Sequence, residues 1–123
     1  MEETKKTILI VDDTPENIDI LRELLSEYDK KIAVNGEMAI KVAEKTLPDL
    51  ILLDVMMPVM DGFETAKQLK AHPATANIPI VFVTAKKVTN SFIEGFDISA
   101  EDYIMKPFDP EVLLSVVKSK LDI

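Results

Sequence analysis

Short apolar runs recur along the chain, and charged or turn-forming residues bound each of them. The segments 8–11, 50–53 and 80–83 contain only aliphatic or aromatic residues. Such runs are typical of strands that are buried on both faces of a sheet, which are predicted here at residues 7–11, 50–53 and 79–84. Two shorter strands are predicted at residues 31–34 and 102–105, so five strands are expected in all.

Apolar residues at helical spacing fill the segments between these strands. This spacing predicts helices at residues 15–27, 37–46, 88–98 and from 110 onward, and another that runs from about 61 to 71. The predicted inward positions are Ile18, Leu21, Leu24, Leu25, Ala39, Ile40, Val42, Ala43, Phe92, Ile93, Phe96, Val112, Leu113, Val116, Val117 and Leu121.

Polar residues mark where several of these helices begin. Thr14 and Asp109 each precede a proline and are predicted N-caps, because proline is favoured in the first turn of a helix. Asp61 opens a segment with the form of a capping box. The Asn35-Gly36 pair predicts a turn between a strand and the next helix.

Five strands that alternate with five helices imply right-handed crossovers and a parallel sheet covered on both faces. The expected fold is therefore α/β, a doubly wound three-layer αβα sandwich around a five-stranded parallel sheet. The length of 123 residues suits one domain, expected over residues 1–123 with a core at 6–121.

Composition narrows the classes of function. A formal net charge of −8 argues against direct binding of nucleic acid, which requires clusters of lysine and arginine. No cysteine is present, so disulfides, thiolate zinc sites and thiol nucleophiles are excluded, and a reducing cytoplasm is compatible. The polar start is no signal peptide, and no apolar run approaches the roughly 18 residues of a membrane span. A cytoplasmic protein without membrane contact is expected.

Chemistry-bearing residues follow four of the predicted strands. The strands finish at Asp12-Asp13, Asp54, Thr84 and Lys106. Because the carboxyl ends of parallel strands meet at one edge of the sheet, these side chains are expected to converge there, where ligands bind in open α/β sheets. For each strand end alone, a cap, a turn or a solvated residue is the simpler interpretation. For Asp54, interpreted as a carboxylate at the edge of a central strand, the alternative is a helix N-cap or a turn aspartate.

Three carboxylates that converge repel one another unless a cation neutralises them. Oxygen ligands without histidine or cysteine favour Mg²⁺, which is usually held by one or two carboxylates together with phosphate oxygens. Lys106 and the hydroxyl of Thr84 would bind phosphoryl oxygens. Asp54 is then the natural nucleophile, with an aspartyl phosphate as the product.

In sequence order, four motifs carry a resemblance to the CheY-like receiver domains of two-component response regulators. They are Ile8-Leu9-Ile10-Val11-Asp12-Asp13, the segment from Asp54 to Gly62 (DVMMPVMDG), Thr84-Ala85, and Asp102-Tyr103-Ile104-Met105-Lys106-Pro107-Phe108. The resemblance covers essentially the whole chain and implies a (βα)5 flavodoxin-like fold.

The resemblance implies a role for each site residue. Asp54 would accept the phosphoryl group, and Asp12, Asp13, Asp54 and the backbone carbonyl of Met56 would bind Mg²⁺. Thr84 and Lys106 would hold the phosphoryl group. Thr84 and Tyr103 would form the switch, in which two packings of the protein exchange population; a half-buried strand aromatic is the alternative for Tyr103.

The implied partners are a sensor histidine kinase or a histidine phosphotransfer protein. A downstream output domain or protein would bind the face formed by the helix at 88–98, the strand at 102–105 and the last helix, and a phosphorylation-dependent dimer is compatible with this scheme. Such a domain catalyses its own phosphorylation and dephosphorylation and is not a turnover enzyme. The only histidine, His72, is expected on the surface at the far end of a helix, so the phosphodonor histidine belongs to another protein.

Other classes of function remain as alternatives. An aspartyl phosphatase of the haloacid dehalogenase type would carry a second aspartate two residues after Asp54, where Met56 stands. A nucleotide-binding module would carry a glycine-rich turn after the first strand, where the sequence is Asp-Asp-Thr-Pro. A degenerate receiver that acts as a scaffold would lack part of the acidic set. Met56, Met57 and Met60 are interpreted as loop packing or as a pliable docking patch.

Overall fold

The computed structural model describes residues 5–55, 57, 60, 62–84, 103–106 and 108–121, except for the side chain of Thr84. Within this part of the chain, five parallel strands form one sheet with the order β2-β1-β3-β4-β5. The strands are β1 (Thr7–Val11), β2 (Asp29–Ala33), β3 (Leu50–Leu53), β4 (Ile80–Thr84) and β5 (Tyr103–Met105).

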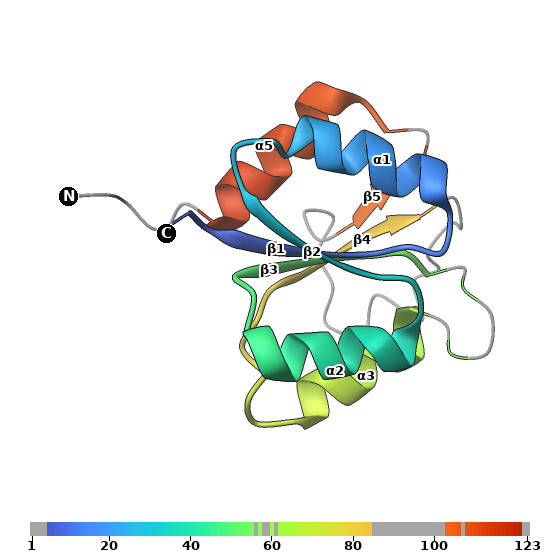
Figure 1. Ribbon diagram of the computed structural model, residues 1–123, viewed down its shortest axis with the longest axis vertical. Helices are drawn as coiled ribbons and strands as arrows, with labels where there is room; N and C mark the ends of the chain where they lie inside the picture. Colours follow the sequence, from blue (N-terminus) through green and yellow to red (C-terminus); the bar gives the residue numbers. More distant parts are fainter. Residues whose placement is uncertain are drawn as a thin grey trace.

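Helices cover both faces of this sheet (Figure 1). The helices α1 (Pro15–Leu24) and α5 (Pro110–Leu121) lie on one face, and α2 (Gly36–Thr46) and α3 (Gly62–Ala71) lie on the other. The predicted α/β three-layer sandwich is therefore confirmed. The predicted helix at 88–98 and the capping box at Asp61 lie outside the described residues. None of the described helices is long and apolar enough to cross a membrane.

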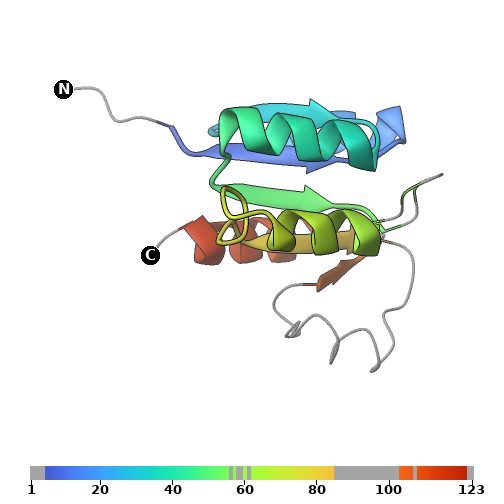
Figure 2. The ribbon, with the colours of Figure 1, turned by 90° about the horizontal axis from the view of Figure 1, so that it is seen from below.

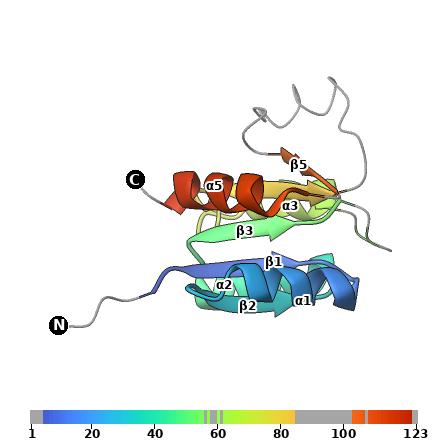
Figure 3. The same ribbon diagram turned by 90° about the horizontal axis from the view of Figure 1, so that it is seen from above.

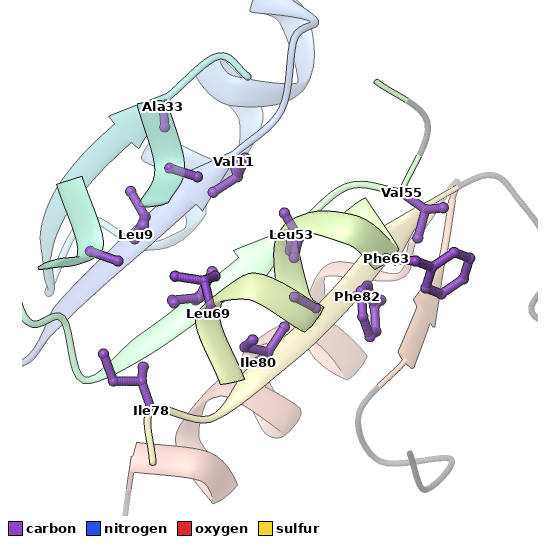
Figure 4. Close-up of a cluster of buried hydrophobic side chains, with 14 of the residues drawn as sticks. Leu9, Val11, Ala33, Leu53, Val55, Phe63, Leu69, Ile78, Ile80 and Phe82 are labelled. Carbon is purple, nitrogen blue, oxygen red and sulfur yellow. The ribbon is translucent and has the colours of Figure 1, made fainter. Parts of the chain in front are cut away.

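Two hydrophobic cores explain the continuous apolar runs. Along β3, Leu50 and Leu52 point into the core beneath α1 and α5, whereas Ile51 and Leu53 point into the core beneath α2 and α3. All four side chains are at most 1% exposed, as expected for a parallel sheet that is covered on both faces. Figure 4 shows the second core, in which the rings of Phe63 and Phe82 lie 5.3 Å apart at 55°.

Several predicted details were wrong. β2 begins at Asp29 instead of 31, because an edge strand tolerates charged residues that a central strand does not. Asn35 forms no separate turn: its side chain caps α2 and accepts a hydrogen bond of 2.8 Å from the backbone N–H of Met38. The first helix ends at Leu24 instead of 27. Val112 was predicted to face inward, but it is 51% exposed, and Leu113 and Val117 carry the buried face of α5.

Asp109 caps α5 as predicted. Its carboxylate accepts a hydrogen bond of 2.8 Å from the N–H of Glu111, and its carbonyl oxygen accepts one of 3.0 Å from the N–H of Leu113. The helix begins directly at Pro110, two residues after Phe108. Since β5 ends at Met105, this short connection places Lys106 at the carboxyl edge of the sheet, the edge where β1 and β3 also end (Figures 2 and 3).

Candidate functional site

The strand register brings three aspartates to the same edge of the sheet. Beyond the end of β1, the N–H of Asp12 donates to the carbonyl of Ala33 at 3.2 Å, which extends the pairing with β2. Beyond the end of β3, the N–H of Asp54 donates to the carbonyl of Val11 at 2.9 Å, which extends the pairing with β1. The backbones of Asp12 and Asp54 are therefore fixed by the sheet itself.

The three carboxylates meet as the sequence predicts. One oxygen from each of Asp12, Asp13 and Asp54 lies within 4.8 Å of the other two, which is close enough to hold a common metal ion. Asp12 is 2% exposed and Asp54 is 5% exposed, whereas Asp13 is open to solvent. Carboxylates this buried are costly unless positive charge or hydrogen-bond donors compensate them.

Lys106 supplies positive charge inside this pocket. Its ammonium nitrogen lies 2.7 Å from Oδ2 of Asp12 and 3.4 Å from Oδ2 of Asp54, and only 14% of its side chain is exposed. The lysine therefore bridges the ends of β1 and β3 from its position after β5. A direct contact across 94 residues of sequence shows that the strand ends converge as predicted.

Asp12 is held through both of its oxygens. While Oδ2 binds Lys106, Oδ1 accepts a hydrogen bond of 2.9 Å from the backbone N–H of Thr14. Thr14 is the N-cap of α1, but its hydroxyl makes no capping bond, contrary to the prediction. Instead the hydroxyl donates weakly, at 3.5 Å, to a carboxylate oxygen of Asp13. The turn that leads into α1 is thus built around Asp12, because aspartate readily accepts from an N–H two residues on.

Gly62 contributes to the site in a way that the sequence did not reveal. Its N–H donates to the carbonyl of Val55 at 2.9 Å, and a Cβ atom at residue 62 would come within 2.7 Å of the Cα of Val55 and collide with the carbonyl oxygen of Asp54. Here its missing side chain allows the start of α3 to pack directly behind the backbone of Asp54.

The remaining predicted site residues have different outcomes. Thr84 ends β4 and pairs in register with Met105, so its backbone lies beside the strand that leads to Lys106, but its side chain lies outside the described part. Tyr103 is half-buried on β5, pairs with Phe82 and packs against the core beneath α3. Met56, whose carbonyl was predicted to bind metal, lies outside the described residues.

His72 and Met57 lie where the simpler interpretation placed them. His72 is on the surface just after α3, where Nε2 lies 3.7 Å from Glu44 of α2 and Nδ1 accepts a hydrogen bond from the N–H of Ala74. Met57 is 7% exposed and belongs to the core beneath α2 and α3. Loop packing therefore accounts for Met57.

The donor set of this pocket is suited to a hard cation and a phosphoryl group. Among the described residues, it offers carboxylate oxygens from three aspartates and no histidine or cysteine ligand, a set that favours Mg²⁺ or a similar ion over zinc or copper. Beside it, one ammonium group is positioned to neutralise an anionic oxygen. A carboxylate, an oxygen-lined cation site and a lysine together can stabilise the charge that moves during phosphoryl transfer.

Comparison with known families identifies the type of domain that this chain resembles. A family model described as the response regulator receiver domain matches residues 8–118. The response regulator PleD of Caulobacter vibrioides is 41% identical over 114 residues, which cover 91% of this chain and 25% of PleD. The chain spans between a quarter and about half of the length of the first curated relatives that it matches.

Solved structures show the same architecture. The chemotaxis protein CheY4 of Vibrio cholerae superposes with a TM-score of 0.85 at 31% identity, covering 96% of this chain and all of that one. The receiver domain of the sensor histidine kinase PA1611 of Pseudomonas aeruginosa gives a TM-score of 0.85 at 25% identity, covering 98% of this chain and all of that one. That structure of PA1611 holds a magnesium ion coordinated in its active-site cleft.

Proposed function

The chain belongs to the response regulator receiver family, and from this premise we propose that it accepts a phosphoryl group on Asp54 from a phosphohistidine of a partner protein and thereby switches conformation. The observation that carries this proposal is the convergence of three carboxylates within 4.8 Å, two of them bridged by Lys106. The family match supports the type of reaction, and the geometry of the pocket supports the choice of residues.

Asp54 fits the role of acceptor better than its two neighbours. Asp12 binds Lys106 at 2.7 Å and the N–H of Thr14 at 2.9 Å, so both of its oxygens are engaged. Asp13 is exposed and lacks the shielding from water that preserves an acyl phosphate. Asp54 is buried, is fixed by the sheet, and lies 3.4 Å from the ammonium of Lys106.

We expect Mg²⁺ to bind at Asp12, Asp13 and Asp54, with the backbone carbonyl of Met56 as a further ligand. The fit rests on the all-oxygen donor set and on its net negative charge, which exceeds what one lysine neutralises. When bound, such an ion would offset the negative charge of the phosphoryl oxygens. The structural neighbour PA1611, in which this ion is present, supports the assignment.

The proposed transfer is a single displacement at the phosphorus atom. A carboxylate oxygen of Asp54 attacks the phosphorus atom, a P–O bond forms, and the P–N bond of the phosphohistidine breaks, with the electron pair returning to the imidazole nitrogen. Lys106 moves its ammonium from Asp12 toward the incoming phosphoryl oxygens. Thr84, at the end of β4, is proposed to donate its hydroxyl to another of these oxygens.

The proposed switch follows from the position of Thr84 beside β5. Movement of Thr84 toward the phosphoryl group would let Tyr103 rotate further into the core, and the phosphoryl group would bias the exchange between two packings. The readout surface would include β5, α5 and the segment at 88–98. A sensor histidine kinase or a histidine phosphotransfer protein is the proposed donor, and an output domain or protein the proposed recipient.

The proposal also includes the extent of the domain and the fate of the phosphoryl group. The chain is proposed to be one receiver domain over residues 1–123 with its core at 6–121, in agreement with the family match to 8–118. Dephosphorylation of its own Asp54 is proposed in place of turnover of a separate substrate, because position 56 carries methionine where an aspartyl phosphatase carries its general acid.

Incubation with acetyl phosphate followed by intact-mass measurement tests the acceptor. We expect a mass increase of one phosphoryl group with Mg²⁺, no increase with EDTA, and no increase for Asp54→Asn in either condition. Asp19→Asn, on the exposed face of α1, is the matched control and should be labelled like the wild type. Labelling of Asp54→Asn at the wild-type rate, or a failure of the wild type to react with any small phosphodonor in Mg²⁺, would contradict the proposal.

Size-exclusion chromatography and NMR spectroscopy with beryllofluoride, an acyl phosphate mimic, test the switch. The wild type in Mg²⁺ and beryllofluoride should change its elution volume or its pattern of amide resonances over β5 and α5, and Thr84→Ala should reduce that change. Identical spectra with and without beryllofluoride, under conditions in which it binds, would show that occupation of the site is not coupled to this face.

A further inference from the structure

Two glycines in the described part of the chain, Gly36 and Gly62, each begin a helix and each lie in tight contact with a neighbouring segment. Gly62 packs against the backbone of Asp54, as described above. Gly36, the first residue of α2, packs against two side chains. A Cβ at residue 36 would lie 2.8 Å from Sδ and 3.0 Å from Cγ of Met60, and it would collide with Oγ1 of Thr65.

The contact between Gly36 and Met60 joins α2 to the loop that follows Asp54. This loop begins after β3 and ends at Gly62, and two hydrogen bonds between its described residues converge on one carbonyl. The N–H of Met57 donates to the carbonyl of Val55 at 3.1 Å, and the N–H of Gly62 donates to the same carbonyl at 2.9 Å. Both bonds are internal to the loop, whereas Met60 contacts a helix from elsewhere in the sequence.

The other side of Gly36 leads back to Asp12. Gly36 follows Ala33, the last residue of β2, by only three positions, and the carbonyl of Ala33 accepts the N–H of Asp12. Asn35 between them caps α2 through its side chain, so the start of the helix is rigidly placed. Gly36 therefore lies between a segment bonded to Asp12 and a loop that begins at Asp54.

From this arrangement we propose that Gly36 is a positioning residue for the acidic site: its missing side chain allows Met60 to dock on α2 and thereby fixes the loop after Asp54 relative to Asp12 and Asp13. The inference rests on the proposed function of that site. Thr65 is fully buried on α3, with a short side chain that has little room to rotate. An added methyl group at residue 36 would therefore push the side chain of Met60 away from α2 or move α2 away from α3.

Isothermal titration calorimetry of Mg²⁺ binding to Gly36→Ala, at a temperature below the melting transition, tests this inference. We expect the dissociation constant for Mg²⁺ to rise by about tenfold, the usual scale for residues that orient metal ligands without binding the metal themselves. The amide resonances of Val55 and Gly62 should also shift in the metal-free protein. The matched control is Lys41→Gly, which weakens α2 at an exposed position five residues after Gly36.

A structural role would produce a different result from a positioning role. If Gly36 only supported the packing of helices, Gly36→Ala and Lys41→Gly would both lower the melting temperature, and both would bind Mg²⁺ as the wild type does. That result would overturn the inference and leave the proposed function intact. Failure of the wild type to bind Mg²⁺ would instead overturn the proposed function, and the inference with it.

Substitutions at Met60 test the proposed route and serve if Gly36→Ala does not fold. Met60→Ala should weaken Mg²⁺ binding by a similar factor, whereas Met60→Leu, which preserves the volume, should stay close to the wild type. In the double variant with Gly36→Ala, the two effects should not add, because both break the same contact. Wild-type affinity of Met60→Ala, or full additivity in the double variant, would show that Gly36 does not act through Met60.

Discussion

Lys106 binds Asp12 more closely than it binds Asp54: its ammonium nitrogen lies 2.7 Å from Oδ2 of the first and 3.4 Å from Oδ2 of the second. The lysine thus neutralises the most buried carboxylate of the pocket, at the edge where a divalent cation is proposed to bind. A cation that enters between Asp12 and Asp54 competes with this ammonium, and a phosphoryl group on Asp54 attracts it. The same ammonium therefore neutralises the carboxylates in the metal-free protein and can bind a phosphoryl group on Asp54.

Removal of this ammonium should destabilise the metal-free protein. In Lys106→Met the carboxylate of Asp12, only 2% exposed, loses its ion-pair partner while its two acidic neighbours remain. Breaking a buried ion pair from one side typically costs about 3 kcal/mol or more of unfolding free energy. Urea denaturation in EDTA measures this loss. Lys41→Met, an exposed lysine of α2, is the control and should change stability little.

The same variant should gain more from Mg²⁺ than the wild type does, since the ion then has no internal competitor. Equal stability of Lys106→Met and wild type in EDTA would show that the pair with Asp12 contributes nothing net. A smaller Mg²⁺ effect in the variant would show that the ammonium does not compete with the ion.

Magnesium should stabilise the wild type by mass action. A ligand that binds only the native state adds about 2.7 kcal/mol to the free energy of unfolding at one hundred times its dissociation constant. The three carboxylates converge only in the folded chain, so Mg²⁺ should bind that state alone. Asp13→Asn removes one carboxylate and relieves repulsion in the metal-free pocket. We therefore expect this variant to melt no lower than the wild type in EDTA but to lose most of the increase that Mg²⁺ produces. Equal melting temperatures of the wild type in EDTA and in excess Mg²⁺ would contradict the site.

The parts of the fold that the sequence predicted best are those where one physical requirement dominates. Burial on both faces demands an unbroken apolar run, so β3 (Leu50–Leu53) was recognised within one residue, and the carboxylate that follows it could be placed at the sheet edge. Parallel connections then required Asp12, Asp54 and Lys106 to meet. The convergence of these three side chains could therefore be predicted from the residues at the strand ends alone.

The predictions failed where the same residues are compatible with two different local structures, or where a contact joins distant segments. Charged Asp29 and Lys30 gave no strand signal, because an edge strand is paired on one side only. Asn35 suits a turn and a helix cap equally well, and only the position of α2 decides. The tight contacts of Gly36 and Gly62, and the closer approach of Lys106 to Asp12, depend on distances between segments remote in sequence. No local pattern encodes those distances.

Gly62 offers a test in which two effects have opposite signs. In the exposed interior of a helix, glycine to alanine is stabilising by about 1 kcal/mol. At residue 62, however, the methyl group would meet backbone atoms of Asp54 and Val55, which cannot rotate away. Overpacking of this kind typically costs about 1–3 kcal/mol, so Gly62→Ala should lower the unfolding free energy. Chemical denaturation decides the sign, and a stabilised Gly62→Ala would mean that α3 can shift without cost.

Two of the N-caps, Asn35 and Thr14, should respond differently to alanine. Asn35 accepts a hydrogen bond of 2.8 Å from the N–H of Met38, and loss of such a cap typically costs about 1 kcal/mol. The hydroxyl of Thr14 makes no capping bond and instead lies 3.5 Å from a carboxylate oxygen of Asp13, to which it donates weakly. Asn35→Ala should therefore reduce the unfolding free energy clearly more than Thr14→Ala in urea titrations at equal conditions. A larger loss for Thr14→Ala would assign to its hydroxyl a role that the geometry does not show.

Leu47 should be a site of stored backbone strain. It follows α2 as its C-cap with a φ of 47°, the one positive φ among the non-glycine residues that the structure describes, and its side chain is 55% exposed. The left-handed conformation costs a residue with a Cβ roughly 1 kcal/mol that glycine does not incur, and little apolar contact is lost on truncation at so exposed a position. Leu47→Gly should therefore raise the unfolding free energy by about 0.5–1 kcal/mol, measured by urea denaturation. Leu47→Ala separates the two contributions, because it removes the side chain but keeps the strain. If glycine stabilised the protein no more than alanine does, the left-handed cap would carry no measurable strain.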